Sequence, residues 1–119
     1  MNTCGKQYED RAEQYLRVQG LHILARNFAT KTGEIDIICK TDTTLIFVEV
    51  RARSNPRFAS AAASVDRRKQ QRLIRTAQMF LQRHQQWAQL PCRFDVLAFE
   101  PPQLKTDDAP TWIRCAFTA

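Results

Sequence analysis

The stretch GEIDIICKTDTTLIFVEVR, residues 33–51, decides the fold of this chain. It contains two runs rich in isoleucine, leucine and valine, residues 34–40 and 45–51, separated by the polar residues 41–44. Short alternating runs of this kind, joined by a few turn-forming residues, are typical of a β-hairpin. The sequence therefore predicts two neighbouring antiparallel strands with a short connection.

The register of this hairpin follows from the alternation of apolar and charged residues. A connection of two or four residues places one apolar set on a common face: Ile35 opposite Val50, Ile37 opposite Val48, and Cys39 opposite Ile46. The other face then holds Asp36 opposite Glu49 and Glu34 opposite Arg51. A connection of three residues would mix apolar with charged positions, because a shift of one residue exchanges the two faces of a strand. The register given by a connection of two or four residues is therefore predicted.

Asp36 and Glu49 are the candidate metal ligands of this hairpin. Two carboxylates that face each other across a strand pair repel unless a positive charge lies between them. Arg51 could supply that charge in a structural network, whereas Mg²⁺ or Mn²⁺ would supply it more strongly through oxygen ligands. Metal-assisted phosphodiester hydrolysis needs such an arrangement, because the cation clamps the phosphate and activates water. Both interpretations, metal site and charge network, remain open at this point.

The segment before the hairpin predicts a helix followed by a strand. Apolar residues at helical spacing indicate a helix over residues 5–19 that ends at Gly20. Residues 21–29 alternate like a strand, with Leu21, Ile23 and Ala25 expected on one face. Together with the hairpin, this gives the beginning of an α/β domain.

The segment after the hairpin adds a second helix and two strands. Residues 65–84 form a helical pattern for which Ser64 is a plausible N-cap. Residues 93–99 and 111–117 are predicted as strands, and residues 52–64 and 101–110 as loops. The predicted order is α-β-β-β-α-β-β, and the strand–helix–strand step implies a parallel crossover within a mixed sheet.

Length and composition indicate one ordinary globular domain over residues 1–119. The chain is 44% apolar and 25% charged, as in typical globular domains. It has no signal-peptide pattern and no apolar run near the ~20 residues that span a bilayer, so a cytoplasmic location without membrane contact is expected. Its four cysteines are scattered without a C-x-x-C pair, which favours reduced thiols over disulfides or a zinc site.

Positive charge is concentrated in one segment. The whole chain carries a net charge of +6, whereas the segment from Arg51 to His84 holds nine basic residues and one acid, Asp66. Such a concentration suits a polyanion, most commonly nucleic acid. The candidate phosphate contacts are Arg53, Arg67, Arg68, Lys69, Arg72 and Arg75. The alternative interpretation is a solvated helix face.

Several motifs along the chain resemble one protein family. They are Gly5-x-x-Tyr-Glu-Asp-x-Ala with Tyr15-Leu16, Arg26-Asn27, Gly33-Glu-Ile-Asp-Ile-Ile, Phe47-Val-Glu-Val-Arg, Val65-x-x-x-Lys69 with Arg72-Leu73, and Arg93-Phe-Asp-Val. In these motifs the chain resembles the YraN-like family of uncharacterised bacterial proteins. That family is similar to archaeal Holliday-junction resolvases and other nucleases with the PD-(D/E)XK core.

The resemblance implies a restriction-endonuclease-like core, a mixed β-sheet flanked by helices, and an acidic Mg²⁺ or Mn²⁺ site. Asp36 and Glu49 take the places of the two motif acids, and Glu9 resembles the helix glutamate of the resolvases. Glu9 could instead belong to an exposed helix face beside Glu13 and Arg17. Asp95, in the Arg-Phe-Asp-Val motif, is either a supporting residue of the site or a structural residue.

Arg51 departs from the motif, which has lysine at this position. Arginine stays charged at any working pH, so it neutralises charge well but transfers protons poorly. Two functional hypotheses follow: a metal-dependent endonuclease acting on DNA, with branched or damaged DNA as candidate substrates, or a non-catalytic nucleic-acid-binding module of the same fold. DNA is favoured over RNA, and a junction-type nuclease is expected to form a homodimer. A protein-interaction domain for an acidic partner is the third hypothesis.

Overall fold

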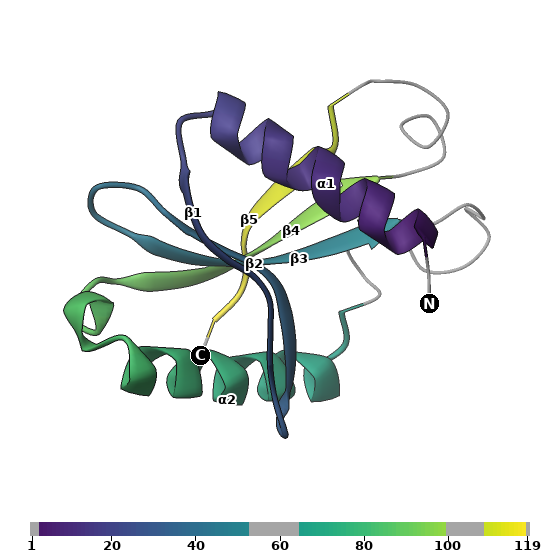
Figure 1. Ribbon diagram of the computed structural model, residues 1–119. Helices are drawn as coiled ribbons and strands as arrows, with labels where there is room; N and C mark the ends of the chain where they lie inside the picture. Colours follow the sequence, from purple (N-terminus) through teal and green to yellow (C-terminus); the bar gives the residue numbers. More distant parts are fainter. Residues whose placement is uncertain (1–2, 53–64, 100–108, 119) are drawn as a thin grey trace.

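The computed structural model describes residues 3–52, 65–99 and 109–118 (Figure 1). Its elements are α1 (Thr3–Val18), β1 (His22–Thr30), β2 (Gly33–Lys40), β3 (Leu45–Ala52), α2 (Arg67–Arg83), the short 3₁₀ helix η2 (Gln85–Trp87), β4 (Cys92–Phe99) and β5 (Thr111–Phe117). The predicted order α-β-β-β-α-β-β is confirmed. The predicted loops 52–64 and 101–110 lie almost entirely outside the described residues.

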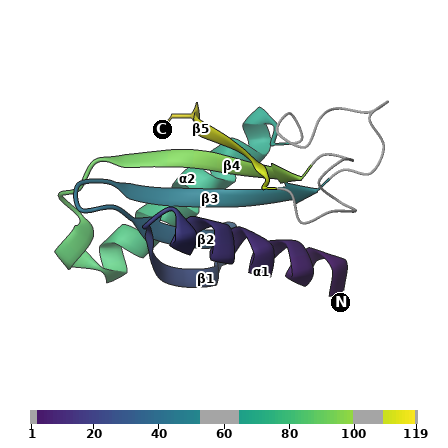
Figure 2. The ribbon, with the colours of Figure 1, turned by 90° about the horizontal axis from the view of Figure 1, so that it is seen from above.

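The five strands form one mixed sheet in the order β1-β2-β3-β4-β5. Strands β3 and β4 are parallel, while the other three neighbouring pairs are antiparallel. The parallel pair is joined through α2, as the crossover predicts. Helix α1 covers one face of the sheet and α2 the other (Figures 1 and 2). The chain is therefore an α/β protein with a central sheet between two helices.

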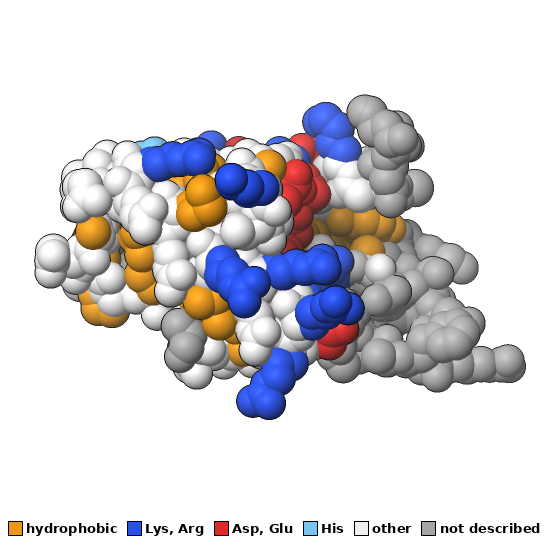
Figure 3. Space-filling model, turned by 90° about the horizontal axis from the view of Figure 1, so that it is seen from below, with side chains coloured by type: hydrophobic (Ala, Val, Ile, Leu, Met, Phe, Trp, Pro, Cys, Tyr) orange, Lys and Arg blue, Asp and Glu red, His pale blue; other side chains and the backbone are white. Residues whose placement is uncertain are grey.

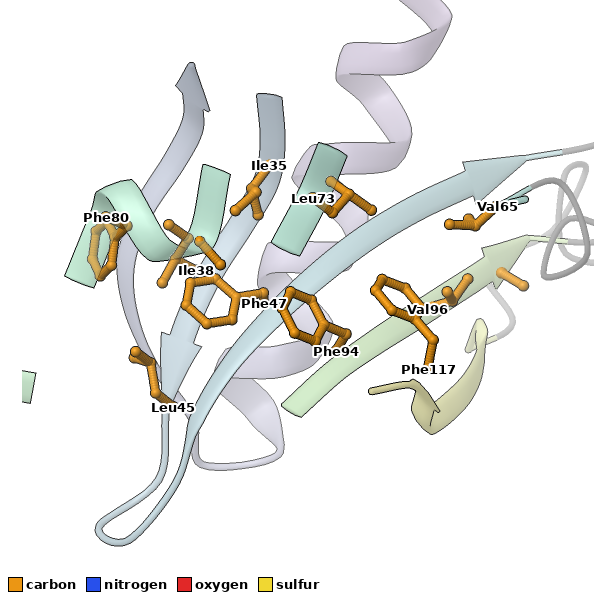
Figure 4. Packing of buried hydrophobic residues seen from close by; sticks show 12 residues of the cluster. Ile35, Ile38, Leu45, Phe47, Val65, Leu73, Phe80, Phe94, Val96 and Phe117 are labelled. Atoms are coloured by element: carbon orange, nitrogen blue, oxygen red, sulfur yellow. The ribbon is translucent and has the colours of Figure 1, made fainter. Parts of the chain in front are cut away.

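The core on the α2 side consists largely of aromatic and branched side chains (Figure 4). Phe80 of α2 packs edge-on against Phe28 and Phe47, with ring centroids 5.2 and 6.1 Å away. Phe94 stacks on Phe47 at 5.2 Å and on Phe117 at 4.8 Å. Such aromatic pairs add about 0.5–1.5 kcal/mol each beyond area burial. The Phe80 contacts fix α2 against the sheet, and the Phe94 stacks join neighbouring strands.

The core on the α1 side uses the opposite set of strand residues. Its members are Ala12, Leu16, Leu21, Ile37, Cys39, Ile46, Val48, Leu97 and Phe99. Burial in this core raises the pKa of the Cys39 thiol to about 12, so this cysteine is an inert packing residue, as expected. Cys92 and Cys115 are also free thiols. None of the described helices is long and apolar enough to cross a membrane.

The β2–β3 hairpin has the predicted register, with a connection of four residues. Ile37 pairs with Val48 and Cys39 with Ile46. The connection is closed by a hydrogen bond from the Thr41 amide to the Thr44 carbonyl at 2.9 Å. The Thr41 hydroxyl also accepts hydrogen bonds from the amides of Thr43 and Thr44.

Two predicted face assignments are wrong. Ile35 packs in the α2-side core, whereas Ile37 and Cys39 lie in the α1-side core. In β1, Ile23 contacts the α1-side core but Ala25 contacts the α2-side core, because the β1–β2 register shifts between these two residues. Such an irregularity moves later side chains to the other face, which strict alternation cannot predict.

The start of α2 also differs from the prediction. The N-cap is Asp66, whose side chain accepts a 2.9 Å hydrogen bond from the amide of Lys69. Ser64, the predicted cap, lies outside the described residues. Val65 is buried in the α2-side core, so the helix begins only after this residue has entered the core. Serine and aspartate are both good N-cap residues. The packing of Val65 in the core places the start of the helix at Asp66.

Candidate active site

The β2–β3 ladder ends at the pair Ile37–Val48, although β3 continues to pair with β4 as far as Ala52. Beyond that point the side chain of Asp36 replaces a backbone partner: its Oδ2 atom accepts a hydrogen bond from the amide of Val50 at 2.9 Å. The two strands therefore separate at the position of the two acids, Asp36 and Glu49. We call this place the β2–β3 fork.

Glu49 is the buried acid of the fork. Its exposed fraction is 3%, and its carboxyl is in hydrogen-bonding contact with that of Asp36. Burial raises the pKa of Glu49 well above its ordinary value, and the hydrogen bond and charge of Asp36 raise it further, with Glu34 adding a smaller effect. Two carboxyl groups held this closely retain a proton or attract a cation.

Arg51 lies beside this pair, two residues beyond Glu49 on β3. Its positive charge opposes the rise in the pKa of Glu49. The side chain is half-buried, and its Nε atom is shielded from solvent without an acceptor among the residues that the structure describes. A buried N–H group without an acceptor is costly, so this Nε atom is an unsatisfied donor beside the two acids.

Glu9 is connected to the fork by other polar side chains. Its Oε1 atom accepts hydrogen bonds from Asn27 Nδ2 at 3.0 Å and from Arg26 Nη2 at 3.3 Å. Asn27 Nδ2 also lies 3.4 Å from Oε1 of Glu34, whose charge acts on Glu49. Glu9 therefore lies on the sheet side of α1, where Arg26 joins it to the neighbouring Glu13.

Arg26 and Asn27 were not predicted as site residues, although the Arg26-Asn27 motif contains them. Arg26 forms ion pairs with three carboxylates of α1, namely Glu9, Asp10 and Glu13. Asn27 has a left-handed backbone with φ of 52°, a conformation that asparagine tolerates better than most residues. A polar Arg-Asn pair within a predicted strand is the sequence signal for these contacts.

The donor set of the fork fits a hard divalent cation. Asp36 and Glu49 offer carboxylate oxygens, the ligands that Mg²⁺ prefers, and a cation would compensate the charge that raises the pKa of Glu49. Across the described ranges, no group of three or more His, Cys, Asp or Glu side chains is arranged to hold a metal ion. The candidate ligands within the chain are therefore two carboxylates, and the remaining positions of Mg²⁺ would be filled by water and substrate oxygens.

Helix α2 presents the predicted basic surface. Arg67, Arg68, Arg72 and Arg75 are exposed, and Lys69 is half-buried. No ion pair joins any of these five side chains to a carboxylate within the described part of the chain. Figure 3 shows lysine and arginine side chains gathered on this side of the molecule, next to acidic ones. Arg53 lies outside the described residues.

Asp95 is a structural residue of β4. Its exposed fraction is 0%, and its carboxylate accepts hydrogen bonds from Arg93 Nε, from Trp112 Nε1 at 2.8 Å and from the amide of Cys115 at 3.0 Å. These donors come from β4 and β5. The structure therefore gives Asp95 the role of tying the edge strand to the sheet.

The fold and the fork define an α/β protein whose mixed sheet carries a carboxylate pair with one buried member, Glu49, consistent with a nuclease-like core. Residues 8–99 match the model of a family described as "Uncharacterised protein family UPF0102". The chain belongs to this family, which confirms the resemblance to the YraN-like proteins.

Curated relatives match almost the whole chain. A UPF0102 protein of Saccharophagus degradans is 50% identical over 117 residues, covering 98% of this chain and 94% of the relative. A UPF0102 protein of Stutzerimonas stutzeri is 46% identical, with 97% and 94% coverage. One from Methylobacillus flagellatus is 44% identical, and the match covers both chains completely.

Proposed function

We propose that this protein binds DNA and hydrolyses its phosphodiester bonds with a divalent cation, Mg²⁺ or Mn²⁺. The observation that carries the proposal is the contact between Asp36 and buried Glu49 at the β2–β3 fork, next to an unsatisfied Arg51 donor. Perturbed acids beside a specific charged group are typical of functional sites. A cytoplasmic location, branched or damaged DNA as substrate, and a homodimer on junctions belong to the same proposal.

Each of the site residues would have a separate role. Asp36 and Glu49 hold the cation, which supplies activation of water and charge neutralisation at the phosphate. Arg51 holds a phosphate oxygen through its guanidinium donors. The cations of α2 hold the DNA backbone, a contact that positions the substrate without reading its sequence. Glu9, linked to Glu34 through Asn27, belongs to the acidic edge of the site.

A non-catalytic DNA-binding module is the second candidate function, and Arg51 is the observation that favours it. A guanidinium keeps its charge at all working pH values, so it is suited to holding phosphate and poorly suited to moving a proton. In this case Asp36 and Glu49 would still bind a cation, but the bound DNA would not be cut.

Cleavage assays test the proposal directly. Labelled duplex, single-stranded and four-way-junction DNA would be incubated with the protein in Mg²⁺, in Mn²⁺ and in EDTA. Metal-dependent products are expected with the natural protein at low turnover, and none with Asp36→Asn or Glu49→Gln. Asparagine keeps an oxygen that can accept the Val50 amide hydrogen bond, so Asp36→Asn removes charge without removing this contact.

Metal binding is measured separately from cleavage. Mg²⁺ and Mn²⁺ are expected to raise the melting temperature of the natural protein, because a ligand that binds only the folded state stabilises it. Asp36→Asn should lose this increment. DNA binding with a metal response but without cleavage would establish the non-catalytic module. If calorimetry detects no metal binding at millimolar concentration, with or without DNA, the metal site is disproved.

A further inference from the structure

The turn between β1 and β2 is fastened to α2 by hydroxyl groups. Thr32 Oγ1 lies 2.8 Å from Thr76 Oγ1 of α2 and 2.6 Å from Thr30 Oγ1. The amide of Thr32 also donates to Thr30 Oγ1 at 3.1 Å. Thr76 is completely buried and donates a further hydrogen bond to the Arg72 carbonyl. The turn therefore has a fixed position against the middle of the basic helix.

Gly33 allows this close approach. Its φ of 150° lies in a region that favours glycine. A β-carbon at this position would meet Thr76 Oγ1 at 3.3 Å and the Cβ atom of Arg72 at 3.7 Å. The absence of a side chain thus brings the start of β2 directly against the basic helix.

The contact between the β1–β2 hairpin and α2 continues along one face of the helix. Thr32 contacts Met79 Sδ at 3.9 Å, and the guanidinium of Arg83 lies over the ring of Phe28, 5.6 Å from its centroid. Positions 72, 76, 79 and 83 follow the three- and four-residue spacing of one helix face. Figure 1 shows the β1–β2 hairpin crossing α2, with its tip extending past the helix.

Lys31 occupies the tip of this fastened turn. It is exposed, its two neighbours form the threonine contacts, and no ion pair joins it to a carboxylate in the described segments. We infer that the β1–β2 turn is a second part of the nucleic-acid-binding surface, in which Lys31 contacts a backbone phosphate next to those held by Arg72 and Arg75. The inference rests on the DNA-binding part of the proposed function.

Charge and rigidity both support a phosphate as the ligand of Lys31. The basic residues of α2 all lie on a single helix. Lys31 adds a positive charge from the adjacent β1–β2 turn. Because hydrogen bonds already hold the backbone of the turn, binding orders only the lysine side chain, and less conformational entropy is lost. An ammonium group on a flexible stem can follow a phosphate on duplex or branched DNA alike.

The test is the salt dependence of DNA binding by Lys31→Ala. Each phosphate contact contributes roughly −0.9 to the slope of log K against log salt concentration on duplex DNA. Lys31→Ala should therefore reduce the magnitude of the slope by about 0.9, and Lys31→Arg should restore it. Lys6→Ala is the matched control, since it removes the same charge from the exposed side of α1 and should leave the slope unchanged.

The outcomes separate the two proposals. If Lys31→Ala keeps the natural slope while Arg72→Ala flattens it, the turn is not part of the surface, although DNA binding through α2 stands. The same conclusion follows if Lys6→Ala changes the slope as much as Lys31→Ala does. If the natural protein binds no nucleic acid at low salt, the proposed function fails and the inference falls with it.

Discussion

The carboxyl group of Glu49 lies in hydrogen-bonding contact with that of Asp36, in a position almost closed to solvent. The contact forms where β2 and β3 separate, and the Val50 amide fixes the Asp36 carboxylate there. Holding a second acid against a buried one opposes folding whenever both are ionised. The arrangement therefore favours a proton, or the proposed metal cation, between the two groups.

The first prediction concerns the pH dependence of stability through Glu49→Gln. The folded state raises the pKa of Glu49, so this group stabilises the fold below its ordinary pKa, and the contribution is lost as pH rises through the raised value. Glu49→Gln should therefore be more stable than the natural protein at pH 8 in EDTA, with a smaller difference at pH 5. Urea unfolding at both pH values measures this. If the variant and the natural protein differ in free energy of unfolding by the same amount at both pH values, the pKa of Glu49 is not raised in the folded state.

The second prediction concerns Arg51→Lys. Lysine supplies a compact ammonium whose pKa burial can lower, whereas arginine remains charged and forked. We expect Arg51→Lys to cut DNA measurably faster than the natural protein in Mn²⁺, with DNA affinity changed less than about threefold because the charge is conserved. Single-turnover cleavage and equilibrium binding measure the two effects. Faster cutting by the natural protein would assign the catalytic role to arginine itself.

The third prediction concerns the basic face of α2. Replacing Arg68, Lys69 and Arg72 by alanine removes three candidate phosphate contacts, so the salt slope of DNA binding should fall by up to about 2.7 in magnitude. The affinity for all sequences should weaken alike. The control replaces Lys6, Arg17 and Arg114, which removes the same charge elsewhere on the surface. If both triple variants show the same salt slope of DNA binding, the binding surface does not lie on α2.

The fourth prediction separates a structural acid from a site acid. Asp95→Asn should reduce the free energy of unfolding by about 2–3 kcal/mol, because a buried carboxylate loses charge-assisted hydrogen bonds. The melting-temperature increment from Mg²⁺ should survive in this variant. Asp36→Asn should show the reverse: a small stability change and no increment. Thermal and chemical unfolding with and without metal distinguish the two residues, and matching behaviour would contradict their assigned roles.

Much of the fold could be predicted because it depends on local patterns. Alternation with a period of two and a four-residue turn were enough to pair Ile37 with Val48, since side chains of a strand point to alternate faces. The same local rule fails at Ile35, which packs on the α2 side. The break falls at Asp36, whose side chain accepts a hydrogen bond from the Val50 amide of the neighbouring strand.

The sequence by itself determined the order of the elements, the hairpin register and the basic character of α2, because these follow from residue spacing and charge. Only the tertiary structure decided that Glu49 is buried, that Glu9 is held by Arg26 and Asn27, and that Asp95 joins β4 to β5. Each of these depends on residues far apart in the chain. Burial and hydrogen-bond partners across such distances are set by the packing of both helices on the sheet, which no local spacing encodes.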